Sequence, residues 1–163
     1  TAYGWIRRGK RKEIMSNTGR QRLNLSGAID IFTKKVFVKE DETLNSEATI
    51  AFLQMLESSY PSAGKVDVFC DNARYYKNKE VMAYLATSKI YMHFFFFYSP
   101  NLNPIERLWK FMNEHVLYNR YYEKFTDFKK EVLGFLQGLK NQESVLSEAL
   151  DKRVSDHFHA IGA

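Results

Sequence analysis

Hydrophobic and polar positions alternate over residues 23–29, and a β-branched and aromatic run follows at 36–38 after a polar stretch. Alternation with a period of two is typical of a strand that buries one face, and β-branched residues favour strands. The pattern therefore predicts an antiparallel β-hairpin near the start of the chain.

A helical pattern follows the predicted hairpin. Asn45 precedes a run in which Ile50, Leu53 and Leu56 recur at helical spacing, and Pro61 closes the run. Asparagine is a favoured N-cap residue, and proline cannot continue a helix. We expect a crossover helix over this segment.

Two short apolar runs, at 65–70 and 90–95, have the length of buried strands. Val81, Tyr84 and Leu85 lie between them at helical spacing. The order strand, helix, strand predicts a parallel pair of strands.

Helices are predicted for the rest of the chain. Ser99–Pro100 requires a loop, because proline disfavours helical backbone in the residue before it. Asn103 and Pro104 then supply an N-cap and a proline at the first helical position, and an apolar stripe continues to about Tyr118. Further helices are expected after Thr126–Asp127 and over 142–153.

Composition limits the class of protein. A chain of 163 residues with 45% hydrophobic and 15% aromatic residues is long enough for one globular domain with a full core. No apolar run is long enough to span a bilayer, so no membrane association is expected. The single cysteine, Cys70, forms no internal disulfide, and the first residues do not resemble a signal peptide, so we expect a cytoplasmic protein.

Positive charge is concentrated at the N-terminus. Residues 1–22 hold seven basic residues and one acid, Glu13, whereas the rest of the chain holds 17 basic residues and 18 acids. Such a cluster suits a polyanion such as DNA, although a solvated terminus explains the charge equally well. We call these seven residues the N-terminal basic cluster: Arg7, Arg8, Lys10, Arg11, Lys12, Arg20 and Arg22.

Two carboxylates stand out as candidate catalytic groups. Asp71 ends the first of the two apolar strands, with Asn72 beside it, and Glu106 lies in the first turn of the helix that begins at Pro104. Strand ends are where sites form in α/β sheets, and carboxylate oxygens are the ligands that hard divalent cations prefer. The pair predicts a metal site for phosphodiester chemistry.

Structural roles are alternatives for both residues. An Asp–Asn pair after a strand often makes a turn, and Glu106 stands three residues after Asn103, as in a capping box. Arg107 and Lys110 favour the metal site, because cations beside the carboxylate would grip a phosphate backbone.

The segments 70–74 and 98–109 together resemble the catalytic domain of bacterial insertion-sequence transposases of the mariner-like, DDE-type superfamily. The spacing of 34 residues between Asp71 and Glu106 matches that group. The segments 5–10 and 27–30 are also similar, so the resemblance covers roughly residues 3–135, followed by a C-terminal helical tail from about 140.

The resemblance implies a ribonuclease-H-like α/β fold, in which helices flank a mixed five-stranded sheet. It also implies three acids that hold two Mg²⁺ or Mn²⁺ ions, with Asp71 as the second acid and Glu106 as the third. The implied function is DNA cleavage and strand transfer during transposition. The implied partners are transposon ends and target DNA, in association with the bacterial nucleoid, and a homodimer is compatible with pairing two DNA ends.

This sequence departs from the family pattern at two places. The first catalytic Asp of such transposases lies on a strand upstream of the segment that matches Trp5–Lys10, so we expect this chain to begin after that strand. Asp30 is an alternative ligand, although the resemblance places it in the hairpin turn. At Phe95–Phe97, relatives carry a segment with two prolines. The absence of these prolines leaves the backbone that leads to Glu106 less restricted.

These observations favour a transposase catalytic domain. The alternatives are a catalytically inactive fragment that binds DNA, and a ribonuclease-H-like nuclease without strand transfer. Tyr75 and Tyr76 are candidates for stacking on bases, with packing expected for at least one of them. The expected DNA contacts are Arg7, Arg8, Lys10, Arg11, Asn72, Arg74, Arg107 and Lys110.

Overall fold

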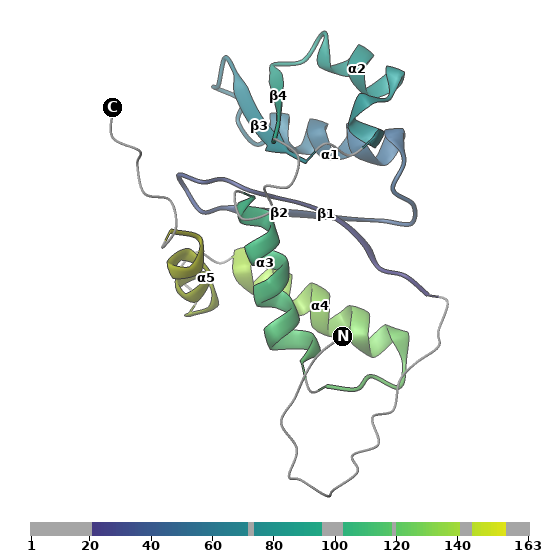
Figure 1. Cartoon of the computed structure of the whole chain (residues 1–163), viewed down its shortest axis with the longest axis vertical. Coiled ribbons are helices and arrows are strands. Elements are labelled where there is room, and N and C mark those ends of the chain that lie inside the picture. The colour runs from purple at the N-terminus through teal and green to yellow at the C-terminus, as the bar shows by residue number, and fades with distance from the viewer. Residues whose placement is uncertain (1–20, 72–73, 96–102, 119, 141–144, 156–163) are drawn as a thin grey trace, which may run out of the picture.

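The computed structural model describes residues 21–71, 74–95, 103–118, 120–140 and 145–155 (Figure 1). Its strands are β1 (Asn24–Ile29), β2 (Val36–Asp41), β3 (Val66–Cys70) and β4 (Ile90–Phe94). Its α-helices are α1 (Ser46–Ser58), α2 (Lys79–Leu85), α3 (Pro104–Met112), α4 (Phe125–Lys140) and α5 (Val145–Ser155). This arrangement confirms the predicted α/β class.

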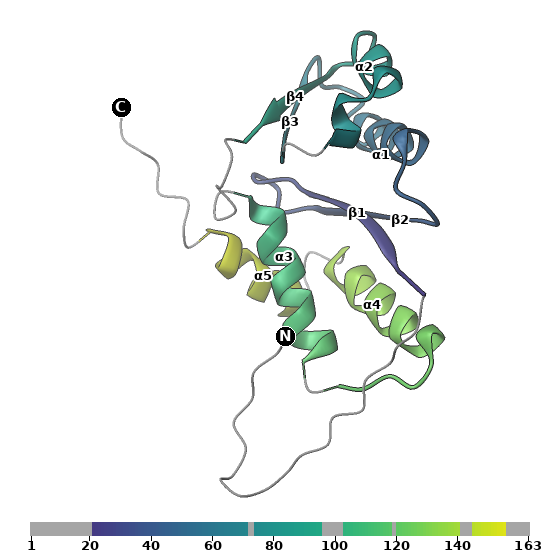
Figure 2. The ribbon, with the colours of Figure 1, turned by 45° about the vertical axis from the view of Figure 1, so that its right-hand side comes forward.

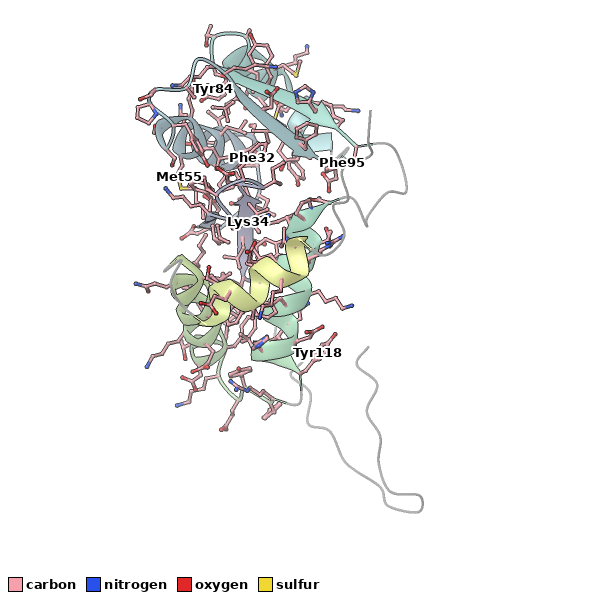
Figure 3. The ribbon with its side chains drawn as sticks, turned by 90° about the vertical axis from the view of Figure 1, so that its left-hand side faces the viewer. Phe32, Lys34, Met55, Tyr84, Phe95 and Tyr118 are labelled. Atoms are coloured by element: carbon pink, nitrogen blue, oxygen red, sulfur yellow. The ribbon has the colours of Figure 1, made fainter. Side chains whose placement is uncertain are left out.

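The predicted hairpin is confirmed. β1 pairs antiparallel with β2 from Asn24 opposite Asp41 to Ile29 opposite Val36. The Asp30 carboxylate accepts hydrogen bonds from the N–H groups of Phe32 (2.8 Å) and Thr33 (3.0 Å), which closes the turn. Lys34 follows at this turn, and its Nζ lies 3.8 Å from Oδ1 of Asp151 in α5 (Figure 3).

The predicted parallel pair is also confirmed. β3 and β4 pair in register from Val66 opposite Ile90 to Cys70 opposite Phe94, with α2 in the connection between them. Asn78 caps α2 by accepting a hydrogen bond from the N–H of Glu80 (2.9 Å). The connection therefore has the strand, helix, strand order read from the sequence.

The five-stranded sheet implied by the resemblance is not formed by the described part of the chain. There, the four strands make two separate two-stranded sheets, β1–β2 and β3–β4. Among the described strands, no ladder of hydrogen bonds joins one pair to the other.

Hydrophobic cores lie on both faces of the β1–β2 hairpin, because side chains on a strand point alternately to opposite faces. Phe37 packs with Phe52 and Leu53 of α1 and with residues of α2, β3 and β4. Val36 packs on the other face, with Leu108 of α3 and with residues of α4 and α5. Figures 1 and 2 show this arrangement, with α1 and α2 on one side of the hairpin and α3 and α4 on the other.

The helix predicted at Pro104 begins there. Asn103 is its N-cap and accepts a hydrogen bond from the N–H of Ile105 (3.3 Å). The α-helical part ends at Met112, and a single π-helical turn continues it to Leu117, close to the predicted end. No helix in the described ranges is long and apolar enough to cross a membrane.

Candidate active site

Asp71 directly follows β3, where the strand backbone is still held by its neighbour. The N–H of Phe95 donates a hydrogen bond to the carbonyl of Cys70 (2.9 Å), so the ladder between β3 and β4 reaches the residue before Asp71. The Cys70 side chain is buried, whereas Asp71 is exposed. This environment fixes the backbone at position 71 and leaves the carboxylate at the surface of a cavity.

Glu106 lies in the first turn of α3 and is exposed. The capping box, which the sequence offers as an alternative role for Glu106, is not formed: among the described residues, the Glu106 carboxylate accepts no hydrogen bond from the N–H of Asn103. The backbone N–H of Glu106 instead donates to the Asn103 carbonyl (3.1 Å), and the Asn103 side chain caps the helix alone. The Glu106 carboxylate is therefore not needed to cap α3.

Trp109 fixes α3 against β1. A β-carbon at position 27 would lie 2.6 Å from Cζ2 of Trp109 and 3.3 Å from Cδ1 of Ile105. Only glycine leaves room for the indole this close to the strand, so Gly27 permits the close packing of helix on sheet. Because Glu106 lies between Ile105 and Trp109 in the helix, this contact also sets the position of the backbone that carries Glu106.

Asp71 and Glu106 line the same cavity, which has a volume of about 150 Å³. The structure therefore brings together the two residues that the sequence singled out as a pair. The other lining residues come from β1, from α1 and the segment before it, from β3 and the segment after it, and from α3 with its N-cap: Leu25, Ser26, Gly27, Leu44, Thr49, Phe52, Cys70, Tyr75, Tyr76, Asn103, Ile105 and Trp109.

Burial and the charge of Asp71 affect the neighbouring titratable groups. Burial raises the pKa of the Cys70 thiol to about 12, and the Asp71 carboxylate adds to the increase. Burial likewise raises the pKa values of Tyr75 and Tyr76, whose rings lie 4.5 Å apart between centroids. These three groups therefore remain protonated and neutral at physiological pH beside the carboxylates.

The structure describes only some of the predicted DNA-contact residues. Lys110 is exposed on α3. Arg107 does not line the cavity, and its Nη1 donates a hydrogen bond to the carbonyl of Val154 in α5 (3.2 Å). Arg74 begins a short 3₁₀ helix. The remaining predicted contacts, Arg7, Arg8, Lys10, Arg11 and Asn72, and two residues of the Phe95–Phe97 departure, Phe96 and Phe97, lie outside the described residues.

Asp30 lies in the hairpin turn and does not line the cavity that holds Asp71 and Glu106. Its carboxylate accepts hydrogen bonds from the Tyr60 hydroxyl (2.6 Å) as well as from the turn. Partial burial raises the pKa of Asp30, but these hydrogen bonds outweigh it and leave the pKa below its usual value. These contacts give Asp30 a structural role in the turn.

The contact between Gly27 and Trp109 is the feature of the site that sequence reasoning missed. A signal was present, because an isolated glycine inside a strand often marks close approach of another element. The sequence did not say which element approaches, since the partner lies in a helix far along the chain.

Comparisons with known proteins agree with the resemblance seen in the sequence. Residues 1–129 match the family model described as DDE superfamily endonuclease. The insertion element IS630 uncharacterized 39 kDa protein of Shigella sonnei is 25% identical over 134 residues, which are 82% of this chain and 39% of that protein. The chain thus spans well under half the length of this relative.

A solved structure is also similar. It is a chain of the simian T-cell lymphotropic virus intasome in complex with the PP2A regulatory subunit B56 gamma. The match has a TM-score of 0.46 and 16% identity, and it covers 81% of this chain and 41% of that chain.

Proposed function

Because this chain belongs to the DDE superfamily endonuclease family, we propose that it is part of a transposase catalytic domain that cuts and joins DNA. One observation carries the proposal. Asp71 at the end of β3 and Glu106 at the start of α3 line one cavity, although they are far apart in the sequence. We also propose that the complete domain has a ribonuclease-H-like fold.

The donor groups at this cavity suit Mg²⁺ or Mn²⁺. Asp71 and Glu106 offer carboxylate oxygens, and Ser26 adds a hydroxyl to the lining. Hard divalent cations take oxygen ligands in this way, and they favour carboxylates above other side chains. Cys70 is not a competing ligand, because its side chain is buried and its soft sulfur is a poor ligand for these hard cations.

A bound pair of metal ions would supply the activation of an attacking water or DNA 3′-hydroxyl and the stabilisation of the leaving oxygen. The contribution of the chain itself is to position the two residues that carry the carboxylates. The β3–β4 ladder fixes the backbone that carries Asp71, and the packing of Trp109 against Gly27 fixes the helix that carries Glu106. The backbone that carries each carboxylate is thereby held before the substrate arrives, which lowers the cost of organising the site.

A third acid is part of this proposal. The ranges that the structure describes contain no group of three or more His, Cys, Asp or Glu side chains that could hold a metal ion. We therefore expect the remaining ligand to come from outside these ranges. The partners proposed for the whole protein are transposon and target DNA, in a homodimer that pairs two DNA ends.

Metal binding tests the site directly. Mn²⁺ binding, measured by loss of the free-ion electron paramagnetic resonance signal, is expected to weaken in Asp71→Asn and in Glu106→Gln. The matched control is Asp127→Asn, which removes an exposed acid from the first turn of α4 and should bind Mn²⁺ as the wild type does. Equal binding by all four proteins would remove Asp71 and Glu106 from the metal site.

DNA cleavage separates the proposal from its alternative. The second candidate, DNA binding without catalysis, is favoured by the fact that the described part of the cavity holds two carboxylates rather than three. Nicking of supercoiled plasmid in Mn²⁺ that is lost in Asp71→Asn would support catalysis by this chain. DNA binding with no nicking at any metal concentration would support the alternative.

A further inference from the structure

A short 3₁₀ helix, Arg74–Lys77, lies between β3 and α2, beside the cavity that holds Asp71 and Glu106. It contributes Tyr75 and Tyr76 to the lining of that cavity. The proposed metal site uses carboxylates and does not use either phenol. The 3₁₀ helix therefore brings further polar groups to the site, with a role separate from metal binding.

Tyr75 is the more exposed of the two tyrosines, with 41% of its surface accessible, and the two rings lie 4.5 Å apart between centroids. Burial raises the pKa of both hydroxyls, and the hydrogen bond between them adds to the increase at Tyr76 but opposes it at Tyr75. These opposite effects indicate that Tyr76 donates and Tyr75 accepts, because a donor stabilises the charged form of its acceptor. The proton of the Tyr75 hydroxyl can then be donated to another acceptor.

Lys77 adds a positive charge at the end of the same 3₁₀ helix, and its side chain is exposed. Its Nζ lies 5.2 Å from the centroid of the Phe94 ring, and Phe94 is the strand partner of Cys70. Burial and the Asp71 charge raise the pKa of the Cys70 thiol, and the charge of Lys77 opposes them. The ammonium is therefore close enough to act on groups that line the cavity.

The contact with the Phe94 ring restricts the position of the Lys77 ammonium, because a cation is attracted to the face of an aromatic ring. The contact between the two tyrosine rings restricts Tyr75 in the same way. A hydroxyl donor and an ammonium on one short helix suit a phosphate group, since lysine and tyrosine side chains are among the usual phosphate contacts of DNA-binding proteins.

We propose that Tyr75 and Lys77 together bind one backbone phosphate of DNA beside the metal site. The Tyr75 hydroxyl donates a hydrogen bond to a phosphate oxygen, and the Lys77 ammonium neutralises its charge. The inference rests on the proposed function, because DNA held for cutting is what brings a phosphate to this cavity. It requires no metal ion, since neither group is a metal ligand.

Such a contact positions DNA and does not read its sequence. Phosphate contacts fix the register and orientation of the duplex on the protein. Because Tyr75 and Asp71 line the same cavity, a phosphate bound at Tyr75 places the backbone close to the carboxylates. Loss of either contact should therefore weaken binding to the same extent for duplexes of different sequence.

The salt dependence of DNA binding tests Lys77. Fluorescence anisotropy with a duplex of random sequence, over a range of KCl concentrations and without divalent metal, is expected to show a log–log slope that is smaller by about 0.9 in Lys77→Gln. Lys77→Arg keeps the charge and should keep the wild-type slope. The matched control is Lys79→Gln, which removes an exposed charge two positions along and should also leave the slope unchanged.

Tyr75→Phe tests the hydroxyl, because it keeps the ring against Tyr76 and removes only the donor. DNA affinity is expected to fall by about tenfold, as for a hydrogen bond to a charged group, while the salt slope stays the same, because a phenol releases no counterion. The control is Tyr91→Phe, since Tyr91 is 54% exposed on β4 and does not line the cavity. It should bind DNA as the wild type does.

Three results would overturn the phosphate site. They are a wild-type slope in Lys77→Gln, equal slopes in Lys77→Gln and Lys79→Gln, and a wild-type affinity in Tyr75→Phe. Mn²⁺ binding guards against a purely structural effect: Lys77→Gln should bind Mn²⁺ at least as tightly as the wild type, because a nearby positive charge is lost. Weaker Mn²⁺ binding would show that the substitution disturbs the cavity, and would also overturn the assignment.

Failure of this site can be told apart from failure of the proposed function. Mn²⁺ binding that depends on Asp71 and Glu106, with wild-type DNA binding in Lys77→Gln and Tyr75→Phe, would remove the phosphate site and leave the metal site. The expected changes in slope and affinity, without Mn²⁺ binding at the two carboxylates, would remove the metal site and leave the phosphate site.

Discussion

Gly27 leaves space for the indole of Trp109 against β1, and the position of α3 depends on that space. We expect Gly27→Ala to destabilise the protein by about 1–3 kcal/mol, because overpacking forces the ring or the helix to move. Urea unfolding measures the loss. Since Glu106 is carried by the same helix, Mn²⁺ binding should also weaken.

Gly64→Ala is the matched control, since a β-carbon at position 64 meets nothing within 4 Å. It should leave stability within about 0.5 kcal/mol of the wild type. Replacing Trp109 by Phe in the Gly27→Ala background should recover part of the lost stability, because the smaller ring removes the clash. A Gly27→Ala protein as stable as the control would show that the contact does not constrain α3.

The Cys70 thiol should react slowly with iodoacetamide, because burial and the Asp71 charge raise its pKa to about 12 and the thiolate is the reactive form. Asp71→Asn removes the negative charge and should lower the pKa, which makes alkylation faster at a fixed pH. The pKa should stay above that of an ordinary thiol, since burial is the larger cause. The measurement is the alkylation rate between pH 8 and 10.

Glu106→Gln is the comparison for Cys70, since Glu106 does not contribute to the raised pKa of the thiol. Alkylation of this variant should follow the wild-type rate. If Asp71→Asn and Glu106→Gln changed the rate equally, the effect would come from loosening of the cavity rather than from the Asp71 charge.

Among the elements, α5 is held against α3 by the hydrogen bond from Arg107 to the Val154 carbonyl (3.2 Å). Arg107→Ala leaves that carbonyl near the end of α5 without this charged donor. A hydrogen bond to a charged group contributes about 1.5 kcal/mol or more, so the amides of α5 should exchange about tenfold faster. Hydrogen–deuterium exchange of α5 checks this.

Lys110→Ala is the control for Arg107→Ala, because Lys110 is exposed on the same helix. Exchange in α5 should not change in that variant. Comparison of the two variants also distinguishes a role of Arg107 in holding α5 from a role in contacting DNA. Weaker DNA binding in Arg107→Ala with unchanged exchange in α5 would assign the guanidinium to DNA instead.

Local signals made most elements predictable from the sequence. Asn103 and Pro104 mark the start of α3, and the β-branched run from Val36 marks β2. Helix caps and hydrophobic patterns can be read from the sequence because they involve residues only a few positions apart. Contacts such as Gly27 with Trp109, or Arg107 with Val154, join residues that are far apart in the chain. No periodicity specifies such pairs, so they required the structure.

The pairing of Asp71 with Glu106 was predictable for a different reason. Each residue lies at the end of an element that the sequence marks clearly, a strand in one case and a helix in the other. Their meeting in one cavity was expected from the spacing shared with a known family, and the structure places both in the lining of that cavity. The division of the described strands into two separate sheets was not predictable, because it depends on which strands pair along their edges.

At the scale of the whole molecule, the net charge of +5 resides in the N-terminal basic cluster, and the remainder of the chain is close to neutral. If this cluster binds DNA, the affinity should fall steeply with salt, by about 0.9 in log–log slope for each phosphate contacted. Neutralising four of its members should therefore reduce the slope by up to about 3.6. The variant is Arg7→Gln, Arg8→Gln, Lys10→Gln, Arg11→Gln.

Fluorescence anisotropy with a duplex of random sequence, from 50 to 300 mM KCl, measures this slope. The matched control neutralises four exposed lysines elsewhere, Lys79, Lys124, Lys130 and Lys152, so both variants lose the same charge. Counterion release occurs only where phosphates are contacted, and so only the N-terminal variant should show the reduced slope. Equal reductions in both variants would mean that DNA responds to the net charge of the molecule, and the N-terminal basic cluster would then have no special role in binding.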